Sequence, residues 1–353
     1  SIRRQRQMCI RDRYFSYLLT PLSRVSVGRG DEVRFLKRMQ DIVRGSGIRG
    51  ALGAAWWSDI DPGHEHIVKN DMQQSFDDLF ANNMHIRQAV PWRNGREADF
   101  VPVSTLLCKY QNQPDCRDFR FPSAEKTDQP ENCPACGGNL RYGKGWSVPS
   151  DWSTNVTTTA LTERGVALEQ NLFSREVFKG DVTFQGTLRI NRESPYYDMA
   201  VKWITTDRRI SIGGKRSVLG RVRWKATKMD TPPPNVTPPQ DSNLVALYLR
   251  SPAILVDDLG FPELDLKEWL SDLASHGGEV VDTWPRPTTE SGWNSIAGMP
   301  KPTEWALAPG SAALLRGWDN EALRNLGQGI GLRQNEGFGE VQLVQSYAEG
   351  RGA

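Results

Sequence analysis

Two glycine-rich segments of this 353-residue chain follow one pattern, and this repeat is the feature that most constrains the fold. The first segment reads GKRSVLGRVRW (Gly214–Trp224) and the second reads GLRQNEGFGEVQL (Gly331–Leu343). Both run Gly, one residue, Arg, a short loop, Gly, one residue, Val, and then β-forming residues; the second is two residues longer. A repeated terminal element indicates two related domains rather than one large domain.

A proline-rich stretch marks the boundary between these domains. Asp230–Gln240 holds five prolines in eleven residues, which excludes a helix or a central strand and predicts a semi-rigid linker. The charge changes sign at the same place. Residues 241–353 hold 8 Lys and Arg against 16 Asp and Glu, a net charge of −8, which leaves +10 for residues 1–240. The first two-thirds therefore favour a polyanion; an unevenly charged solvated surface is the alternative.

The expected fold class is α+β, with two ferredoxin-like (RRM-like) domains that carry glycine-rich loops and an inserted zinc-binding segment. The first domain is expected at 14–230, with the zinc insertion at about 104–146 and an extended arm or hairpin at about 154–178. The linker is expected at 231–240 and the second domain at 241–353. Residues 1–13 are arginine-rich without a folding pattern, resemble a translated adapter sequence, and are expected to be an artefactual or disordered tail.

Hydrophobic spacing predicts the main elements. Ile48, Leu52 and Trp56 share one face of a helix that begins near Ser46. Residues 182–190 alternate with period two and predict a strand, and residues 264–275 predict an amphipathic helix with Leu264, Trp269 and Leu273 on one side. Residues 283–303 are expected to form a loop, and residues 304–317 a hairpin.

The glycine-rich loops are candidate phosphate-binding elements. Glycines lack a Cβ, so a nucleic-acid backbone could approach closely, and Arg216 and Arg333 could add charge-assisted contacts. The alternative is a tight hairpin without a ligand. Neither segment matches a Walker A loop or a dinucleotide-binding fingerprint. Further cations surround the first loop, at Arg208, Arg209, Lys215, Arg221, Arg223 and Lys225.

Four of the five cysteines are clustered and predict a structural zinc site. Cys108, Cys116, Cys133 and Cys136 follow the spacing x7, x16 and x2, and CPACGG is typical of a zinc knuckle. Four protein ligands leave no open position, so the Zn²⁺ would be structural and not catalytic. The alternative is a loop with reduced, unliganded cysteines.

Six stretches, in this order along the chain, resemble the RAMP superfamily of CRISPR-associated proteins, and within it most closely the Cas-five-like Csx-ten subunit of type III-D complexes. The stretches are LLTPLSRVSVGRG, GSGIRGALGAAW, ALTERGVALEQNLFSREVF, ISIGGKRSVLGRVRW, WNSIAGMPKPTEWALAPGS and GLRQNEGFGEV. The chain departs from the family in lacking residues ahead of the first strand.

The resemblance implies a CRISPR RNA-binding subunit of a ribonucleoprotein complex of antiviral defence, in which the arm at about 154–178 faces the RNA. Such a subunit holds the 5′ handle of the guide RNA beside a large polymerase/cyclase-like subunit and Cas-seven-like backbone subunits, with target RNA nearby. The residues that the resemblance and the loops assign to RNA are Arg44, Ser46, Arg49, Arg164, Arg175, Arg208, Arg209, Gly213, Gly214, Lys215, Arg216, Arg221, Gly331, Arg333, Gly337 and Gly339.

Catalysis is not expected. None of the four histidines, His64, His66, His85 and His276, is near a glycine-rich loop in the sequence, which argues against a histidine-based ribonuclease. Two alternatives stay open: a RAMP endoribonuclease that processes CRISPR RNA or cleaves target RNA, and a protein-interaction subunit that barely contacts RNA. No apolar stretch is long enough for a bilayer and no signal peptide is visible, so a cytoplasmic protein without membrane contact is expected.

Overall fold

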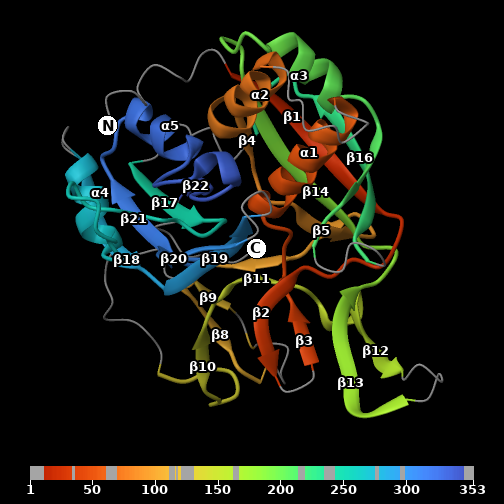
Figure 1. Ribbon diagram of the computed structural model, residues 1–353. Helices are drawn as coiled ribbons and strands as arrows, with labels where there is room; N and C mark the ends of the chain where they lie inside the picture. Colours follow the sequence, from red (N-terminus) through yellow and green to blue (C-terminus); the bar gives the residue numbers. More distant parts are fainter. Residues whose placement is uncertain are drawn as a thin grey trace. The chain divides into compact units, whose positions relative to one another are not determined.

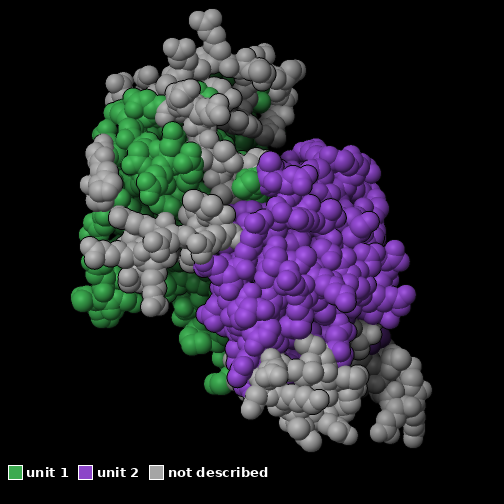
Figure 2. Space-filling view, turned by 90° about the horizontal axis from the view of Figure 1, so that it is seen from above, with its two compact units in different colours: residues 1–9, 100–146, 232–353 green, residues 10–99, 147–231 purple. Residues whose placement is uncertain are grey.

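The computed structural model describes residues 12–33, 36–60, 70–110, 116, 118–120, 131–161, 167–213, 219–233, 243–274, 278–294 and 299–345. These residues form two compact units (Figure 2). Unit 2 comprises residues 10–99 and 147–231, and unit 1 comprises residues 100–146 and 232–353 together with the N-terminal end of the chain. The fold is mixed α/β, with mostly antiparallel strands and few helices.

Unit 2 is built on one antiparallel sheet with the order β15-β16-β1-β14-β5-β6, and β4 also pairs with β14 (Figure 1). Its first strand begins at Asp12 rather than after residue 13, because Asp12 pairs with Asn191 in register and its carboxylate forms an ion pair with Arg189. The strands are β1 (Asp12–Pro21), β4 (Met84–Ile86), β5 (Val90–Arg93), β6 (Arg96–Glu97), β14 (Thr183–Asn191), β15 (Arg208–Ser211) and β16 (Arg221–Lys228).

Helices cover one face of this sheet. Helix α1 (Gly45–Ile60) buries Ile48, Leu52 and Trp56, as the spacing predicts. The Trp56 ring packs edge-on against Trp203, which lies on helix α3. The remaining helical elements of the unit are α2 (Asn70–Phe76), the π-helix η2 (Asp77–Asn83), α3 (Tyr197–Ile204) and the 3₁₀ turn η4 (Ser150–Trp152).

A second sheet of unit 2 has the order β12-β13-β3-β2. Its long antiparallel ribbon is the segment that the sequence analysis interprets as an arm (Figure 1). The four strands are β2 (Gly28–Val33), β3 (Leu36–Met39), β12 (Ser153–Leu161) and β13 (Ala167–Phe178).

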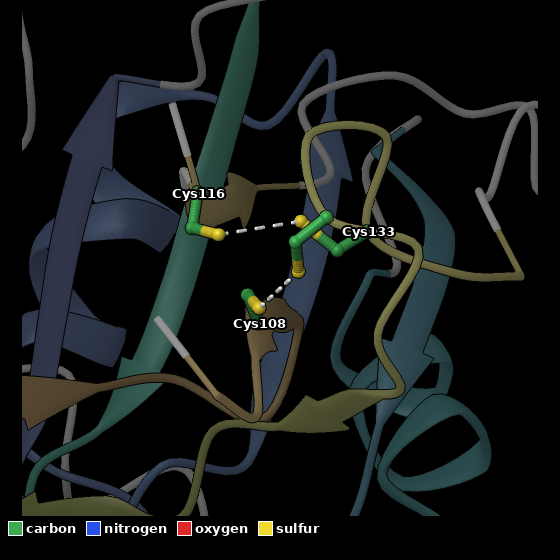
Figure 3. A group of neighbouring side chains, drawn as sticks. Cys108, Cys116 and Cys133 are labelled. Atoms are coloured by element: carbon green, nitrogen blue, oxygen red, sulfur yellow. Dashed lines mark hydrogen bonds between the residues drawn. The ribbon is translucent and has the colours of Figure 1, made fainter. Parts of the chain in front are cut away.

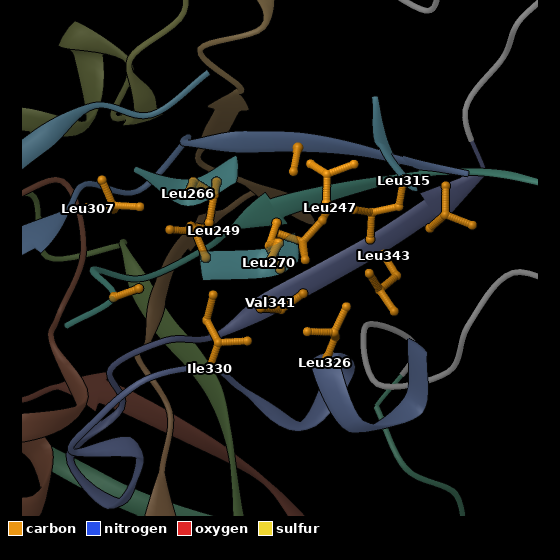
Figure 4. Packing of buried hydrophobic residues seen from close by; sticks show 14 of the residues in the cluster. Leu247, Leu249, Leu266, Leu270, Leu307, Leu315, Leu326, Ile330, Val341 and Leu343 are labelled. Atoms are coloured by element: carbon orange, nitrogen blue, oxygen red, sulfur yellow. The ribbon is translucent and has the colours of Figure 1, made fainter. Parts of the chain in front are cut away.

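Unit 1 contains an antiparallel sheet with the order β18-β21-β17-β22. Helices α4 and α5 pack on one face of it, and Leu247, Leu315 and Leu343 point from the strands into this layer (Figure 4). Helix α4 buries Leu266 and Leu270, while the predicted face of Leu264, Trp269 and Leu273 is only partly buried. The elements are β17 (Leu244–Leu249), α4 (Leu266–Leu273), β18 (Glu279–Trp284), β21 (Ala312–Arg316), α5 (Asn320–Gln328), the 3₁₀ turn η6 (Gln334–Glu336) and β22 (Val341–Gln345).

The strand pairing around residues 287–307 differs from the sequence prediction. Residues 287–294 and 299–307 form a two-stranded hairpin, β19 (Pro287–Asn294) and β20 (Met299–Leu307), where a loop is predicted. Strand β20 pairs with β19 and β21 pairs with β17 and β18, so the predicted hairpin of 304–317 is wrong. The first error missed two strands in a stretch that contains Pro and Gly, and the second paired the wrong strands, because short apolar runs do not encode a partner.

The cysteine-bearing segment belongs to unit 1, although the sequence analysis treats it as an insertion in the first domain. The Arg250 guanidinium, just after β17, lies against the rings of both Phe100 and Trp146, 4.4 and 4.1 Å from their centres, and the two rings also contact each other. The Trp146 indole N–H donates to the Arg250 carbonyl at 2.8 Å. The strands of the segment are β7 (Asp99–Val101), β8 (Thr105–Cys108), β9 (Asp118–Arg120), β10 (Leu140–Tyr142) and β11 (Gly145–Ser147).

The two main sheets share one topology. In unit 2 the order along the chain is β1, α1, β4 and β5, β14, α3, β16, and in unit 1 it is β17, α4, β18, β21, α5, β22. In both, the first strand lies between the third and the last, and the second strand lies beyond the third. None of the described helices has the length and apolar composition that a bilayer-spanning segment needs.

Candidate nucleic-acid interface and metal centre

The helix-free face of the unit 2 sheet carries a row of cations. Strand β16 alternates strictly: Val222, Trp224 and Ala226 are buried, whereas Arg221, Arg223 and Lys225 are exposed. Arg209 on β15 stands directly opposite Arg223 in the register and is also exposed. We call Arg209, Arg221, Arg223 and Lys225 the basic strip. Within the described part of the chain, no ion pair neutralises these four side chains.

The basic strip has the geometry of a polyanion contact. Alternate residues of a strand lie roughly 7 Å apart on one face, so the three cations of β16 form an evenly spaced line. Like charges directly opposite each other destabilise a sheet, and Arg209 faces Arg223 in this way. A phosphate backbone laid along the line would relieve this repulsion. Neighbouring positions on the same face of β1 and β14 carry polar groups, among them Ser16 and Gln185.

The first glycine-rich loop joins β15 to β16. Gly213 and Gly220 have φ values of +75° and +78°, which favour glycine. A Cβ on Gly220 would overlap the carbonyl oxygen of Ile212, and one on Gly213 would overlap that of Ser26. The Ile212 N–H donates to the Gly220 carbonyl at 2.9 Å, and the Gly220 N–H donates to the Arg24 carbonyl at 2.8 Å. The predicted residues Gly214, Lys215 and Arg216 lie outside the described residues.

The second glycine-rich loop repeats this construction. Gly331 and Gly339 have φ values of +73° and +67°, and a Cβ would overlap the carbonyl oxygens of Ile254 and Ile330, respectively. The Ile330 N–H donates to the Gly339 carbonyl at 2.9 Å, and the Gly339 N–H donates to the Pro252 carbonyl at 2.7 Å. Gly331 therefore corresponds to Gly213, one residue before the Gly214 that the sequence pattern pairs with it. In both loops the glycines make room for the chain's own backbone.

The predicted cation of the second loop is neutralised. Arg333 forms an ion pair with Glu304 and a second one with Glu336, at 2.7 Å, and its guanidinium lies 4.6 Å from the centre of the Phe338 ring. Lys301 also binds Glu336, at 2.8 Å. The two cations are thus paired with two carboxylates, Glu304 and Glu336, and this group has no net positive charge with which to bind a phosphate.

The pKa shifts agree with this network. Burial lowers the pKa of Arg333, but the hydrogen bond and charge of Glu336, together with Glu304, outweigh it and raise the pKa above its ordinary value. Burial raises the pKa of Glu336, but Arg333 and Lys301 outweigh it and lower the pKa below its ordinary value.

The other predicted RNA-binding residues are scattered, most of them over unit 2. The Arg44 carbonyl accepts hydrogen bonds from backbone N–H groups in the first turn of α1. Ser46 lies in this turn and is half-buried. The Arg49 Nε donates to the Phe80 carbonyl at 2.9 Å. Arg175 is half-buried on β13, opposite Val156. Gly337, in unit 1, ends η6 with a φ of +82°. Arg164 lies outside the described residues.

Arg208 and Arg209 are neighbours in sequence but point to opposite faces of the sheet. Arg208 lies over the Trp203 ring at 3.7 Å and forms an ion pair with Asp59. Burial lowers the pKa of Arg208, and Asp59 opposes that effect. Arg208 therefore stabilises the helix-covered face, whereas Arg209 belongs to the basic strip. Arg223 and Lys225 are not among the residues that the sequence assigns to RNA. The alternation of apolar and basic residues in RVRWKA is the signal that could have placed both on the exposed face of a strand.

The four clustered cysteines converge on one point. Their sulfur atoms all lie within 4.8 Å of one another, and the Cys108, Cys116 and Cys133 sulfurs point toward a common centre (Figure 3). The Sγ–Sγ distances are 3.6 Å for Cys108–Cys136 and 3.8 Å for Cys116–Cys133. Tetrahedral zinc with Zn–S bonds of about 2.3 Å places its sulfurs about 3.8 Å apart, so this cluster fits a metal ion.

The CPACGG segment is shaped to hold these thiols. Gly137 has a φ of +68°, and its N–H donates to the Cys133 carbonyl at 2.7 Å. A Cβ on Gly138 would lie 3.2 Å from the Cys136 sulfur and 2.5 Å from the Tyr110 ring, so a larger residue would require the exposed Tyr110 side chain to move. A backbone hydrogen bond from Gly138 lowers the pKa of Cys136, but burial and the neighbouring thiols raise it to about 12. Metal-free, the group resists ionisation, which a bound cation would reverse.

The described histidine, His85, and two aspartates that an RNA-cleaving site could use, Asp59 and Asp207, lie in different segments of unit 2. His85 is the one histidine among the described residues, and its Nδ1 lies 3.3 Å from Arg189, which is itself ion-paired with Asp12. Asp59 binds Arg208 and Trp203, and Asp207 is an exposed residue between α3 and β15. His64, His66, His276 and Asp61 lie outside the described residues.

Both units contain a sheet with the same order of strands, and a glycine-rich segment precedes the last strand of each, in a mixed α/β protein. The family described as "CRISPR-associated protein (Cas_Cmr3)" matches residues 160–345, more than half of the chain. The chain belongs to this family of CRISPR-associated proteins.

Solved structures of CRISPR proteins resemble this chain distantly. A subunit of the type III-B Cmr-beta complex bound to cognate target RNA and AMPPnP is 12% identical, with a TM-score of 0.47, and the match covers 85% of this chain and 86% of that one. CRISPR associated protein Cas6 is 10% identical, with a TM-score of 0.35, and 94% and 99% are covered. Oligomeric Cmr4 from Pyrococcus furiosus is 12% identical, with a TM-score of 0.30, and 62% and 99% are covered. No curated protein sequence matches the chain.

Proposed function

We propose that this protein is a non-catalytic, CRISPR RNA-binding subunit of a type III effector complex. It would hold the 5′ handle of the guide RNA and contact the large polymerase/cyclase-like subunit and the Cas-seven-like backbone subunits. Family membership and the motif order support the assignment to CRISPR defence. The type III-D Csx-ten subtype rests on the six motifs alone and stays a prediction.

The observation that carries the RNA-binding proposal is the basic strip. Four exposed cations on two adjacent strands lie on the helix-free face, with an unrelieved Arg209–Arg223 repulsion. RNA is a partner that neutralises such a row along its whole length. The net charge of +10 over residues 1–240 acts in the same direction.

The test is CRISPR RNA binding by the triple variant R221A/R223A/K225A as a function of salt. Each phosphate contact to a single strand contributes about 0.7 to the slope of log K against log salt, so the slope should flatten by about 2. Affinity at low salt should fall by at least about a hundredfold. The matched control is R192A/K202A, which removes two exposed cations of unit 2 that are not on these strands.

One outcome of this experiment would contradict the RNA-binding proposal. If the triple variant and the control bind CRISPR RNA with equal affinity and equal salt slope, the basic strip is not the RNA site. The expected change is large because the three side chains are adjacent and exposed, and their removal leaves the buried face of β16 untouched.

We also infer that both units are ferredoxin-like domains. Each has the chain order β-α-β-β-α-β, antiparallel neighbours, and the first strand between the third and the fourth. In unit 1 both helices cover the same sheet face, since Leu266 and Leu270 of α4 and Leu323 and Leu326 of α5 share one core. The helix-free face of a sheet of this kind remains available for a ligand.

Structural zinc is the third part of the proposal. Four thiol ligands with tetrahedral spacing suit Zn²⁺ and leave no site for substrate. Cys108, Cys116, Cys133 and Cys136 would hold the ion, and the ion would supply crosslinks within the segment. The expected metal content is one zinc per chain.

The alternative function is endoribonuclease activity, in CRISPR RNA processing or target cleavage. Incubating the purified protein with labelled repeat RNA and with labelled target RNA distinguishes the two functions. We expect intact RNA in both reactions. Cleavage at a defined position that is retained after repurification and lost on replacing His85 or Asp207 would make the protein an enzyme.

A further inference from the structure

A loop between β17 and α4 presents two large apolar side chains to solvent. Leu259 is 82% exposed and Phe261 is 64% exposed, and they are the two most exposed large apolar side chains in the described part of the chain. Single exposed apolar residues are ordinary, but two at alternate positions of one tight loop form a small patch. We call residues 257–262 the apolar loop.

The apolar loop is rigid, and its own backbone holds it. The Asp257 carboxylate accepts from the N–H groups of Leu259 and Phe261, both at 2.9 Å, and the Asp257 N–H donates to the Phe261 carbonyl at 2.9 Å. Gly260 has a φ of +87° and closes the turn. Val256 and Pro262 form a bridge below the loop. A side chain held in advance loses little conformational entropy when it binds.

The surroundings of the apolar loop are acidic. Residues 251–266 contain Asp257, Asp258, Glu263 and Asp265 and no Lys or Arg. Asp257, Asp258 and Leu259 are all exposed, so the charge borders the patch directly. An RNA backbone or an anionic membrane surface would be repelled by this rim. A protein surface with an apolar pocket and a basic border fits both features.

We propose that the apolar loop is the docking element through which unit 1 binds a neighbouring protein subunit, with Leu259 and Phe261 in an apolar pocket bordered by Lys or Arg of that subunit. The proposal rests on the proposed function only for the kind of neighbour, namely another protein of the effector complex. An aromatic and an aliphatic anchor with a charged rim is the usual composition of an interface centre. The two units would then have different partners. Unit 2 would bind RNA through the basic strip, and unit 1 would bind protein through the apolar loop and the acidic residues around it.

The test uses the effector complex reconstituted without this subunit and then supplied with the full-length chain. The variant L259S/F261S should bind the complex at least tenfold more weakly than the wild type. Its melting temperature and its affinity for CRISPR RNA alone should be unchanged, because both side chains are exposed and belong to unit 1. The control is Met199→Ala, which truncates a 43% exposed apolar side chain of α3 in unit 2 and should leave binding to the complex unchanged.

A second variant tests the charged rim separately. D258K/E263K reverses two acidic positions and leaves both apolar side chains in place. It should slow association with the complex at low salt, and the difference from wild type should shrink as salt rises, because rim charges act mainly on the association rate. Amide hydrogen exchange of residues 255–264 should slow on assembly.

Three results would overturn the proposal. One is equal affinity of L259S/F261S and wild type for the complex, with unchanged hydrogen exchange in 255–264. Another is a fall in melting temperature of L259S/F261S, which would mean that the two side chains pack within this chain. The third is a dimer of the isolated chain that L259S/F261S abolishes, which would make a second copy the partner. The RNA-binding proposal fails on a different result, namely unchanged RNA binding by the triple variant of the basic strip. That result would leave the docking proposal standing, so the two proposals can be rejected separately.

Discussion

The two glycine-rich loops have the same backbone hydrogen bonds at their described ends and opposite electrostatic surroundings. Gly220 and Gly339 both approach the carbonyl of an isoleucine at the start of their loop, and both donate an N–H to a carbonyl after the first strand of their sheet. The first loop leads into the basic strip, where no carboxylate of the described chain pairs with the cations. In the second loop, Arg333 is bound by Glu304 and Glu336.

The difference indicates that the glycines serve the fold, and we propose that the charges of the basic strip serve RNA binding. The same backbone bend can be present in both units while the side chains around it differ. Residues 241–353 carry a net charge of −8, so their loop supplies its own counter-ions. We therefore expect RNA to contact unit 2 and protein to contact unit 1. The following predictions would break or sharpen this division.

The largest effect is expected from the proposed metal centre, which would stabilise unit 1. Replacing Cys133 with Ser should abolish zinc binding and lower the melting temperature by about 10 °C or more, because structural zinc contributes many kcal/mol to folding. Metal analysis and calorimetry measure the two effects, and Cys9→Ser is the matched control. Hydrogen exchange should accelerate in β17 and β21 before it does in β14. Faster exchange in β14 first would mean that the cysteine-bearing segment does not stabilise unit 1.

The loop glycines should be equally intolerant of substitution in both units. Gly220→Ala and Gly339→Ala should each lower the free energy of unfolding by about 3 kcal/mol or more, because a Cβ would overlap a backbone carbonyl at positive φ. Gly50→Ala, on an open face of α1, is the control and should raise stability by up to about 1 kcal/mol. Denaturant unfolding measures all three. If only one of the two loop substitutions left the free energy of unfolding unchanged, the loops would differ in their backbone as well as in their charge.

Arg333 should separate stability from RNA binding. Arg333→Ala removes the partner of two carboxylates and should cost about 1–2 kcal/mol of stability. CRISPR RNA affinity and its salt slope should not change, because the guanidinium is already paired. Chemical denaturation and RNA titration at several salt concentrations give the two numbers. A flatter salt slope for this variant would return the second loop to the RNA site.

The smallest effect is a pH dependence confined to the second loop. The pKa of Glu336 is lowered in the folded protein, so its contribution is present above the unfolded pKa of about 4.3 and is lost as pH falls through the folded value. The stability difference between wild type and Glu336→Gln should be about 1 kcal/mol at pH 7 and vanish toward pH 3. Arg223→Ala should show no such dependence. Parallel pH profiles for the two variants would contradict the contrast between the loops.

Features with a short repeat along the chain could be predicted from the sequence. The face of α1 and the strand at 183–191 follow from periods of 3.6 and 2, and the four cysteines were identified by composition and spacing. The same reasoning applies to β16, where strict alternation defines the basic strip. These patterns are local, so a few neighbouring residues contain all the information.

Contacts between distant residues could not be predicted in this way. The pairing of β20 with β19 rather than β21, and the separation of Arg208 from Arg209 onto two faces, depend on which strands become neighbours. The shift that matches Gly213 with Gly331 was hidden because Gly213 and Gly214 look the same in sequence. Only the partner carbonyls of Ser26 and Ile254 distinguish them.

The sequence by itself determined that residues 1–240 and 241–353 carry net charges of opposite sign, which residues of α1 and β16 share a face, and that four thiols are grouped along the chain. Only the tertiary structure decided that the cysteine-bearing segment belongs to unit 1, that Arg333 is neutralised by Glu304 and Glu336, and that Leu259 and Phe261 remain uncovered. The physical reason is that periodicity and charge are summed along the chain. Neutralisation and burial depend instead on groups that folding brings together from far apart.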